Sequence, residues 1–128
     1  MTDDVTTVRR FFAAWTASDL EALLALVDPE VVVSALAGLL YERRDYRGRG
    51  GIAAAFTEIA ERWDGFEVHV EEARQAGDQV IALIHVVLTK HEMSSHADLV
   101  VACMLRDGLI VSLAEHEQRR PDPPGPQL

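Results

Sequence analysis

The hydrophobic pattern changes its period at Phe66, and this change limits what the chain can fold into. The segment FEVHVEEA alternates between apolar and polar residues, so that Phe66, Val68 and Val70 are predicted to share one face. Three more strand-like segments follow: QVIALIHVVLTKH, HADLVVACMLR and LIVSLAEHE. Ala76-Gly77-Asp78, EMSS and Asp107-Gly108 separate them as turns, and the last is a strong hairpin signal. The second half of the chain is therefore predicted to form an antiparallel sheet.

The first half of the chain has helical spacing instead. Apolar residues recur three or four positions apart in residues 5–17 and again in residues 52–63. Between these segments, Ser18 and Glu21 are spaced as a capping box that opens a second short helix, which Asp28-Pro29 should end. The β-branched run VVVSA is typical of a strand. We therefore expect an α+β fold, with three N-terminal helices packed on a strongly curved, mainly antiparallel sheet.

Length and charge limit the domain organisation and the partners. The 128 residues suit one domain over residues 1–120, and the segment PDPPGPQL predicts a disordered tail over residues 121–128. With 21 acidic against 12 basic residues, a nucleic-acid partner is not expected, because such binders carry a basic face. The start of the chain is acidic and polar, and every apolar run is shorter than the roughly 20 residues that span a bilayer. We therefore predict a cytoplasmic protein without a membrane partner.

The order of four phrases resembles the SnoaL-like branch of the nuclear-transport-factor-2-like superfamily. These phrases are VRRFFAAWTASDLEALLALVDPEVVV, YRGRGGIAAAF, VEEARQAGDQVIAL and LRDGLIVSLAEHE, and they cover almost the whole chain except the tail. The resemblance implies a cone-shaped α+β barrel with an apolar cavity, and frequent dimers formed through the sheet. Members include ketosteroid isomerases, polyketide cyclases, limonene epoxide hydrolases, dehydratases and non-catalytic binding modules. The fold alone therefore does not determine the activity.

The stretch YERRDYRGRGG, residues 41–51, has the charge of a phosphate-binding loop. GRGGIA fits a loose dinucleotide fingerprint, but that motif works only between a parallel strand and its crossover helix. By resemblance the stretch is instead a connecting loop, with Gly50 and Gly51 making the turn into the third helix. The alternative is a role at the cavity mouth, where one of four arginines would attract an anionic ligand: Arg43, Arg44, Arg47 or Arg49.

The ketosteroid isomerase residues are not kept. That enzyme uses a carboxylate base and an oxyanion hole made by a tyrosine and a protonated carboxylic acid. The resemblance places Phe11 at the tyrosine position, Ser34 near the base position and Val101 near the acid position. An Asp-Arg-Asp constellation like that of the limonene epoxide hydrolases is also missing. Neither of these two reactions is therefore expected.

Glu115 is the best remaining candidate for a general acid or base. Alignment with the family's last strand points Leu113, Glu115 and Glu117 toward the cavity, and burial raises a carboxyl pKa toward the range useful for proton transfer. The alternative is an exposed or salt-bridged glutamate near the end of the sheet. Tyr41 and Ser34 are candidates to hydrogen-bond a ligand oxygen. The residues predicted to line the cavity are Phe11, Trp15, Phe56, Trp63, Val101, Cys103 and Leu113.

Pairing His91 with His96 across the EMSS hairpin gives the sheet one wholly apolar face. This face, which should meet the helices, comprises Val80, Ala82, Ile84, Val86, Leu88, Ala97, Leu99, Val101, Cys103 and Leu105. The histidines would then lie on the outer face, in a dimer interface. His91, His96 and Asp98 are a conceivable metal site, but solvated polar residues near a turn are the interpretation we favour. Neither a metal nor a cofactor is expected.

Two functions remain open at this point. The first is a homodimeric, cofactor-free proton-transfer enzyme, an isomerase, cyclase or dehydratase, that acts on a small apolar or polycyclic molecule through Glu115. The second is a non-catalytic ligand-binding or dimerising module of the same fold, whose cavity side chains fill. An open cavity with a buried Glu115 favours the first function, and a filled interior with an exposed Glu115 favours the second.

Overall fold

A computed structural model describes residues 3–34 and 45–117, with side chains as far as residue 115. Helices and strands follow in the order α1 (Asp4–Thr16), α2 (Leu20–Ala25), β1 (Val27–Ser34), β2 (Tyr46–Arg47), α3 (Gly48–Arg62), β3 (Gly65–Ala76), β4 (Gln79–Lys90), β5 (Met93–Arg106) and β6 (Leu109–Glu117). The predicted α+β class is confirmed. The tail predicted over residues 121–128 lies outside the described residues.

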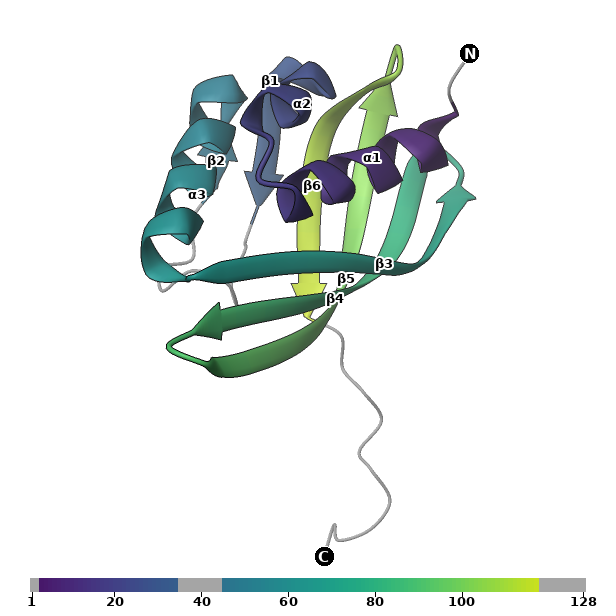
Figure 1. Cartoon of the computed structure of the whole chain (residues 1–128). Helices are drawn as coiled ribbons and strands as arrows, with labels where there is room; N and C mark the ends of the chain where they lie inside the picture. The colour runs from purple at the N-terminus through teal and green to yellow at the C-terminus, as the bar shows by residue number, and fades with distance from the viewer. Residues whose placement is uncertain (1–2, 35–44, 118–128) are drawn as a thin grey trace, which may run out of the picture.

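The six strands form one curled sheet in the order β2-β1-β6-β5-β4-β3. Neighbouring strands are antiparallel except β1 and β6, which run parallel, so the sheet is mainly antiparallel as predicted. The sheet curls without closing into a barrel, because β2 and β3 remain as its two edges. Figure 1 shows the three helices on the side toward which the sheet curls. Register shifts at Val70/Glu72 and Met104/Leu105 are β-bulges, which add local twist and bending.

The start of α2 differs from the prediction. The N-cap is Asp19, whose side chain accepts a hydrogen bond from the Ala22 N–H at 3.0 Å, and Ser18 lies in the preceding turn with a left-handed φ of 55°. Aspartate caps a helix as well as serine does, so the spacing of Ser18 and Glu21 could not distinguish the two. The helix also ends at Ala25, and the proline lies inside β1 instead of ending α2.

The start of α3 is also earlier than predicted. The left-handed residue in the connection is Gly48, with φ 72°, whereas Gly50 and Gly51 already belong to the first turn of the helix. Gly51 is nevertheless required by packing, because a Cβ there would lie 2.9 Å from the carbonyl carbon of Tyr46. Gly48 therefore provides the turn, and Gly51 allows α3 to pack closely against β2.

The hairpin between β4 and β5 turns at His91 and Glu92, whose φ angles are 51° and 69°, and not at EMSS. His96 consequently pairs with Val87 and not with His91. The shift along β4 from position 91 to position 87 is even, so each side chain keeps its predicted face. The apolar face is therefore confirmed: Val80, Ala82, Ile84, Val86, Leu88, Leu99, Val101 and Cys103 are buried, and Ala97 and Leu105 are partly buried.

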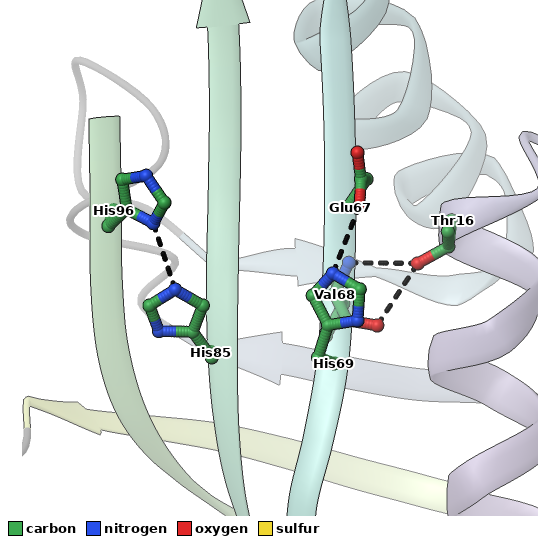
Figure 2. A network of polar contacts seen from close by, with 6 residues as sticks. All are labelled: Thr16, Glu67, Val68, His69, His85 and His96. Carbon is green, nitrogen blue, oxygen red and sulfur yellow. Dashed lines mark hydrogen bonds and ion pairs between the residues drawn. The ribbon is translucent and has the colours of Figure 1, made fainter. Parts of the chain in front are cut away.

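The last residue of α1 fastens that helix to the edge of the sheet. The Thr16 hydroxyl accepts a hydrogen bond from the Val68 N–H at 2.8 Å and donates one to the Val68 carbonyl at 3.1 Å, as Figure 2 shows. Because β3 is an edge strand, these backbone groups would otherwise be open to water or to another chain. Among the described helices, none has the length and apolar character that crossing a membrane requires.

Candidate functional site

A narrow cavity lies between the helices and the inner face of the sheet. The volume of the cavity, measured as the space that the centre of a water molecule can occupy, is about 30 Å³. This is room for about two waters. Aromatic rings from α1 fill much of the space, with Phe11 and Phe12 in edge-to-face contact at 5.2 Å. The interior is thus neither fully open nor closed, which is intermediate between the two states expected from the sequence.

Glu115 is the one ionisable side chain among the described residues that line this cavity. It lies on β6 opposite Val101 of β5, two residues beyond Leu113, so both point to the inner face. Its Oε2 atom is buried, although the residue as a whole is partly exposed. The carboxylate therefore reaches an otherwise apolar wall from the end of the last strand.

Four of the residues predicted to line the cavity do so: Phe11, Trp15, Val101 and Leu113. Cys103 is fully buried in the core but is not among the lining residues. The burial of its thiol raises the pKa of Cys103 from 9.0 to about 12.

The predicted hydrogen-bonding residues are less well placed. Ser34, at the end of β1, is partly exposed, and its neighbour Val33 lines the cavity instead, because successive strand residues face opposite sides. Ser34 consequently points to the other face of the sheet, away from the predicted ligand. Tyr41 and the side chain of Glu117 lie outside the described residues.

Phe56 and Trp63 line a second pocket of about 130 Å³ that adjoins the cavity. Trp15, Ile59 and Phe66 belong to the linings of both spaces, and the Trp15 ring lies 5.7 Å from Phe56 and 5.6 Å from Phe66. The indole Nε1 of Trp63 is buried and has no hydrogen-bond partner among the described residues. An aromatic wall therefore separates the narrow cavity from a wider space, whose lining also includes Ser18 and Asp64.

The cavity also has lining residues that the sequence analysis missed, among them Phe12, Ile52 and Phe66. The helical spacing did place Ile52 on the apolar face of α3. The signal for Phe12 was its position next to Phe11, because adjacent helix residues both reach the core when the apolar stripe is wide. Phe66 was predicted to point inward, but the curl of the sheet that brings it to Trp15 could not be read from its spacing.

The described part of the arginine-rich stretch is not a connecting loop, because it forms β2 and the first turn of α3. The Arg49 guanidinium donates a hydrogen bond to the Val27 carbonyl at 3.2 Å, which joins the start of α3 to β1. Arg47 lies 3.9 Å from Asp45, and its side chain is 73% exposed. The preceding strand, β2, is antiparallel to β1, so this segment lacks the parallel strand that the dinucleotide fingerprint needs. Arg43 and Arg44 lie outside the described residues.

A polar cluster lies on the outer face of the sheet. The Nδ1 atom of His85 is 2.8 Å from Asp98 Oδ1, and its Nε2 atom is 2.9 Å from His96 Nδ1. Figure 2 shows the two imidazole rings pointing toward each other from neighbouring strands. His91 occupies the hairpin turn instead, where its backbone N–H donates to Asp64 Oδ2 at 2.8 Å. The sequence suggested His91, His96 and Asp98 as a metal site. In the structure, His85 and not His91 lies beside His96 and Asp98.

The chain belongs to the SnoaL-like domain family, which matches residues 8–113. No curated protein matches it in sequence. Among solved structures, an NTF2-like protein of unknown function from Burkholderia pseudomallei is 19% identical with a TM-score of 0.80, covering 92% of each chain. TerC, co-crystallised with polyporic acid, is 18% identical with a TM-score of 0.79, covering 90% of this chain and 91% of its own. An LEH-like epoxide hydrolase from M. tuberculosis is 17% identical with a TM-score of 0.76, covering 90% and 82%. At these identities, the likeness establishes the fold alone.

Proposed function

We propose that this protein binds a small, mainly apolar molecule between its helices and its sheet, and that Glu115 transfers a proton to or from that molecule. The reaction would be an isomerisation, cyclisation or dehydration of an apolar or polycyclic substrate. The observation that carries this proposal is the position of Glu115, the one ionisable side chain among the described residues of the cavity wall. One positioned acid or base can transfer such a proton without a cofactor, and contributes typically about 10²- to 10⁴-fold in rate.

The ligand would occupy the cavity together with the adjoining pocket. The cavity alone, at about 30 Å³, holds no ring-sized molecule, but the neighbouring space of about 130 Å³ shares Trp15 and Phe66 with it. Rotation of Trp15 would join the two, leaving Glu115 at the inner end and Ser18, Trp63 and Asp64 in the outer part. Apolar walls with a few polar groups are typical of small-molecule sites. The complex of TerC with polyporic acid is a precedent within the fold.

The alternative is a non-catalytic ligand-binding or dimerising module, and the narrowness of the cavity favours it. In that case, the aromatic rings stabilise the fold and the sheet face provides the function. Such a homodimer would form through the outer face, where Ile81, Leu83, Val87 and Val100 are partly exposed and Met104 is 40% exposed.

The cytoplasmic location, and the absence of nucleic-acid and membrane partners, stay predictions from the sequence.

Proton transfer can be tested with enolisable polycyclic ketones in D₂O, where NMR follows deuterium entering the ketone. The wild-type protein is expected to catalyse exchange in at least one ketone that it binds, and Glu115→Gln to slow it by about 10²- to 10⁴-fold. Glu61→Gln, an exposed glutamate on α3, is the matched control and should leave the rate unchanged.

Two outcomes decide between the functions. A bound ketone whose exchange is no faster than in buffer, or an unchanged rate in Glu115→Gln, would rule out catalysis by Glu115 and leave the binding module. A lower free energy of unfolding in Glu115→Gln, without any change in exchange, would assign the carboxylate a structural role.

A further inference from the structure

Three neighbouring strands bring two carboxylates and an imidazole together on the outer face of the sheet. Glu71 on β3, His85 on β4 and Asp98 on β5 each offer a ligand atom, and these atoms all lie within 4.8 Å of one another. His85 and Asp98 are direct cross-strand partners, which fixes the spacing of two of the three groups. This cluster lies outside the cavity and has no part in the proton transfer proposed for Glu115.

The β-bulge in β3 is what aims Glu71 at the cluster. Val70 pairs with Ile84, and Glu72 pairs with Leu83, so Glu71 is the extra residue with no partner in the ladder. Without the bulge, Glu71 would take the position opposite Leu83, one pair farther along β4 from His85. Bulges commonly re-aim a side chain next to functional sites. The bulge in β3 therefore adds Glu71 to the pair of side chains, His85 and Asp98, that β4 and β5 provide.

We propose that Glu71, His85 and Asp98 bind a divalent first-row transition-metal ion, with His96 as the outer hydrogen-bond partner of His85. The ion would be held by His85 Nδ1 and one oxygen from each carboxylate, with further positions open to water. An imidazole with two carboxylates suits Zn²⁺, Co²⁺ or Mn²⁺, whereas Mg²⁺ and Ca²⁺ prefer sites made of oxygen alone.

The hydrogen bonds of His85 suit this role. The Asp98 carboxylate can only accept, so Nδ1 of the metal-free imidazole donates to it, and Nε2 accepts from His96 Nδ1. When a metal takes the place of the Nδ1 proton, His85 carries its proton on Nε2 and donates to His96, whose own proton moves to its Nε2. Both rings stay neutral and the number of protons is unchanged. A metal-bound histidine nearly always donates its other N–H in this way.

The site is also partly shielded from water. The side chains of His85 and Asp98 are 28% and 20% exposed. Leu83 and Val100 form the next cross-strand pair on the same face and are partly buried. Charges in such an apolar surround interact more strongly than on an open surface. Glu71, which is exposed, would be the ligand that closes over the ion.

Isothermal titration calorimetry of the full chain with Zn²⁺ tests the proposal. We expect saturable binding of one ion per chain, and loss of more than about 100-fold in affinity in His85→Gln and Asp98→Asn. Glu71→Gln should weaken binding less, because its carboxylate is the most exposed ligand. His96→Ala should cost about 10- to 100-fold, which is typical of an outer partner. Mg²⁺ should compete poorly.

His91→Gln is the matched control, because His91 lies in the turn between β4 and β5, six residues beyond His85, and its backbone N–H donates to Asp64. This variant should bind Zn²⁺ as the wild type does. Circular dichroism shows whether each variant is folded. Absence of binding to the wild-type protein, or unchanged affinity in both His85→Gln and Asp98→Asn, would overturn the assignment.

A spectroscopic readout separates coordination by His85 from loose binding to carboxylates. Long-range ¹H–¹⁵N NMR reports the tautomer of each ring, and we expect His85 and His96 to change from Nδ1–H to Nε2–H as Zn²⁺ is added. Co²⁺ should give visible absorption bands in the same titration. If zinc binds but both tautomers stay as they are, His85 Nδ1 is not a ligand and the proposed site is wrong.

Discussion

Thr16 connects the end of α1 to an edge strand through one hydroxyl group. Thr16→Val keeps the shape of the side chain but removes both hydrogen bonds to Val68. We expect it to lower the free energy of unfolding by about 1–2 kcal/mol, because the backbone groups of Val68 lose their partner. Thr16→Ser keeps the hydroxyl and should lose less than half of that amount. Chemical denaturation of the two variants and the wild type measures the difference, and equal losses would contradict it.

The buried thiol of Cys103 should make stability depend on alkaline pH. Its pKa is raised from 9.0 to about 12 in the folded protein, so folding favours the protonated thiol. This contribution is complete below pH 9.0 and is lost as the pH rises toward about 12. The free energy of unfolding should therefore fall by up to about 1.4 kcal/mol per pH unit from this group.

Cys103→Ala provides the comparison, because it lacks the thiol but keeps the other titrating groups. Its free energy of unfolding should be lower at neutral pH, since a buried side chain is truncated, yet should fall less steeply above pH 9.0. Parallel slopes for the two proteins would show that Cys103 does not titrate on unfolding.

Single residues could be placed from the sequence where a regular period holds. The alternation in FEVHVEEA placed Val68 on the inner face, where it is buried. The inward direction of Glu115 came instead from alignment with the family's last strand. The sequence did not place Glu71 beside His85. The bulge adds a residue to β3, and nothing in the segment EEA, residues 71–73, indicates a bulge. Asp19 was missed as a cap because a serine with suitable spacing stands next to it.

At the level of elements, the two adjacent glycines of α3 make a matched pair. A Cβ at Gly50 would meet nothing within 4 Å, whereas one at Gly51 would lie 2.9 Å from the backbone of Tyr46. Gly50→Ala should therefore stabilise the protein, by up to about 1 kcal/mol from helix propensity. Gly51→Ala gains the same propensity but must push α3 away from β2, and we expect a net loss of about 1–3 kcal/mol. Thermal unfolding of both variants measures the opposite signs, and a stabilising Gly51→Ala would show that α3 can move freely.

Hairpins were predictable where glycine supplies the left-handed turn residue. Gly77 and Asp107-Gly108 mark the turns between β3 and β4 and between β5 and β6, and both are confirmed. The turn between β4 and β5 was misplaced, because His91 and Glu92 adopt the same left-handed conformation without a glycine. The predicted inner and outer faces of β4 and β5 are nevertheless correct, since a strand has a period of two and the register shift was even.

For the whole molecule, the homodimer gives the most direct prediction. Leu83 and Val100 face each other across β4 and β5 on the outer face, so charges placed there avoid the core. We expect wild-type protein to sediment as a dimer at micromolar concentration, and Leu83→Glu/Val100→Glu to sediment as a folded monomer. Glu61→Lys, an exposed change on α3 and so on the other side of the sheet, should remain dimeric. If the wild-type protein sediments as a monomer at micromolar concentration, the predicted homodimer is wrong.

The place of β1 beside β6 has a consequence for the order of folding. The Ile110 N–H donates to the Leu26 carbonyl at 3.0 Å, and β1 runs parallel to the last strand, so partners far apart in sequence must meet. During synthesis, β3, β4 and β5 can form hairpins as they emerge, whereas β1 can pair only with the two-residue β2 until β6 has been made. Contacts of such long sequence separation slow folding. The apolar residues of β1 therefore lack their longer neighbouring strand while most of the chain is translated, so this early strand needs protection from aggregation on the ribosome.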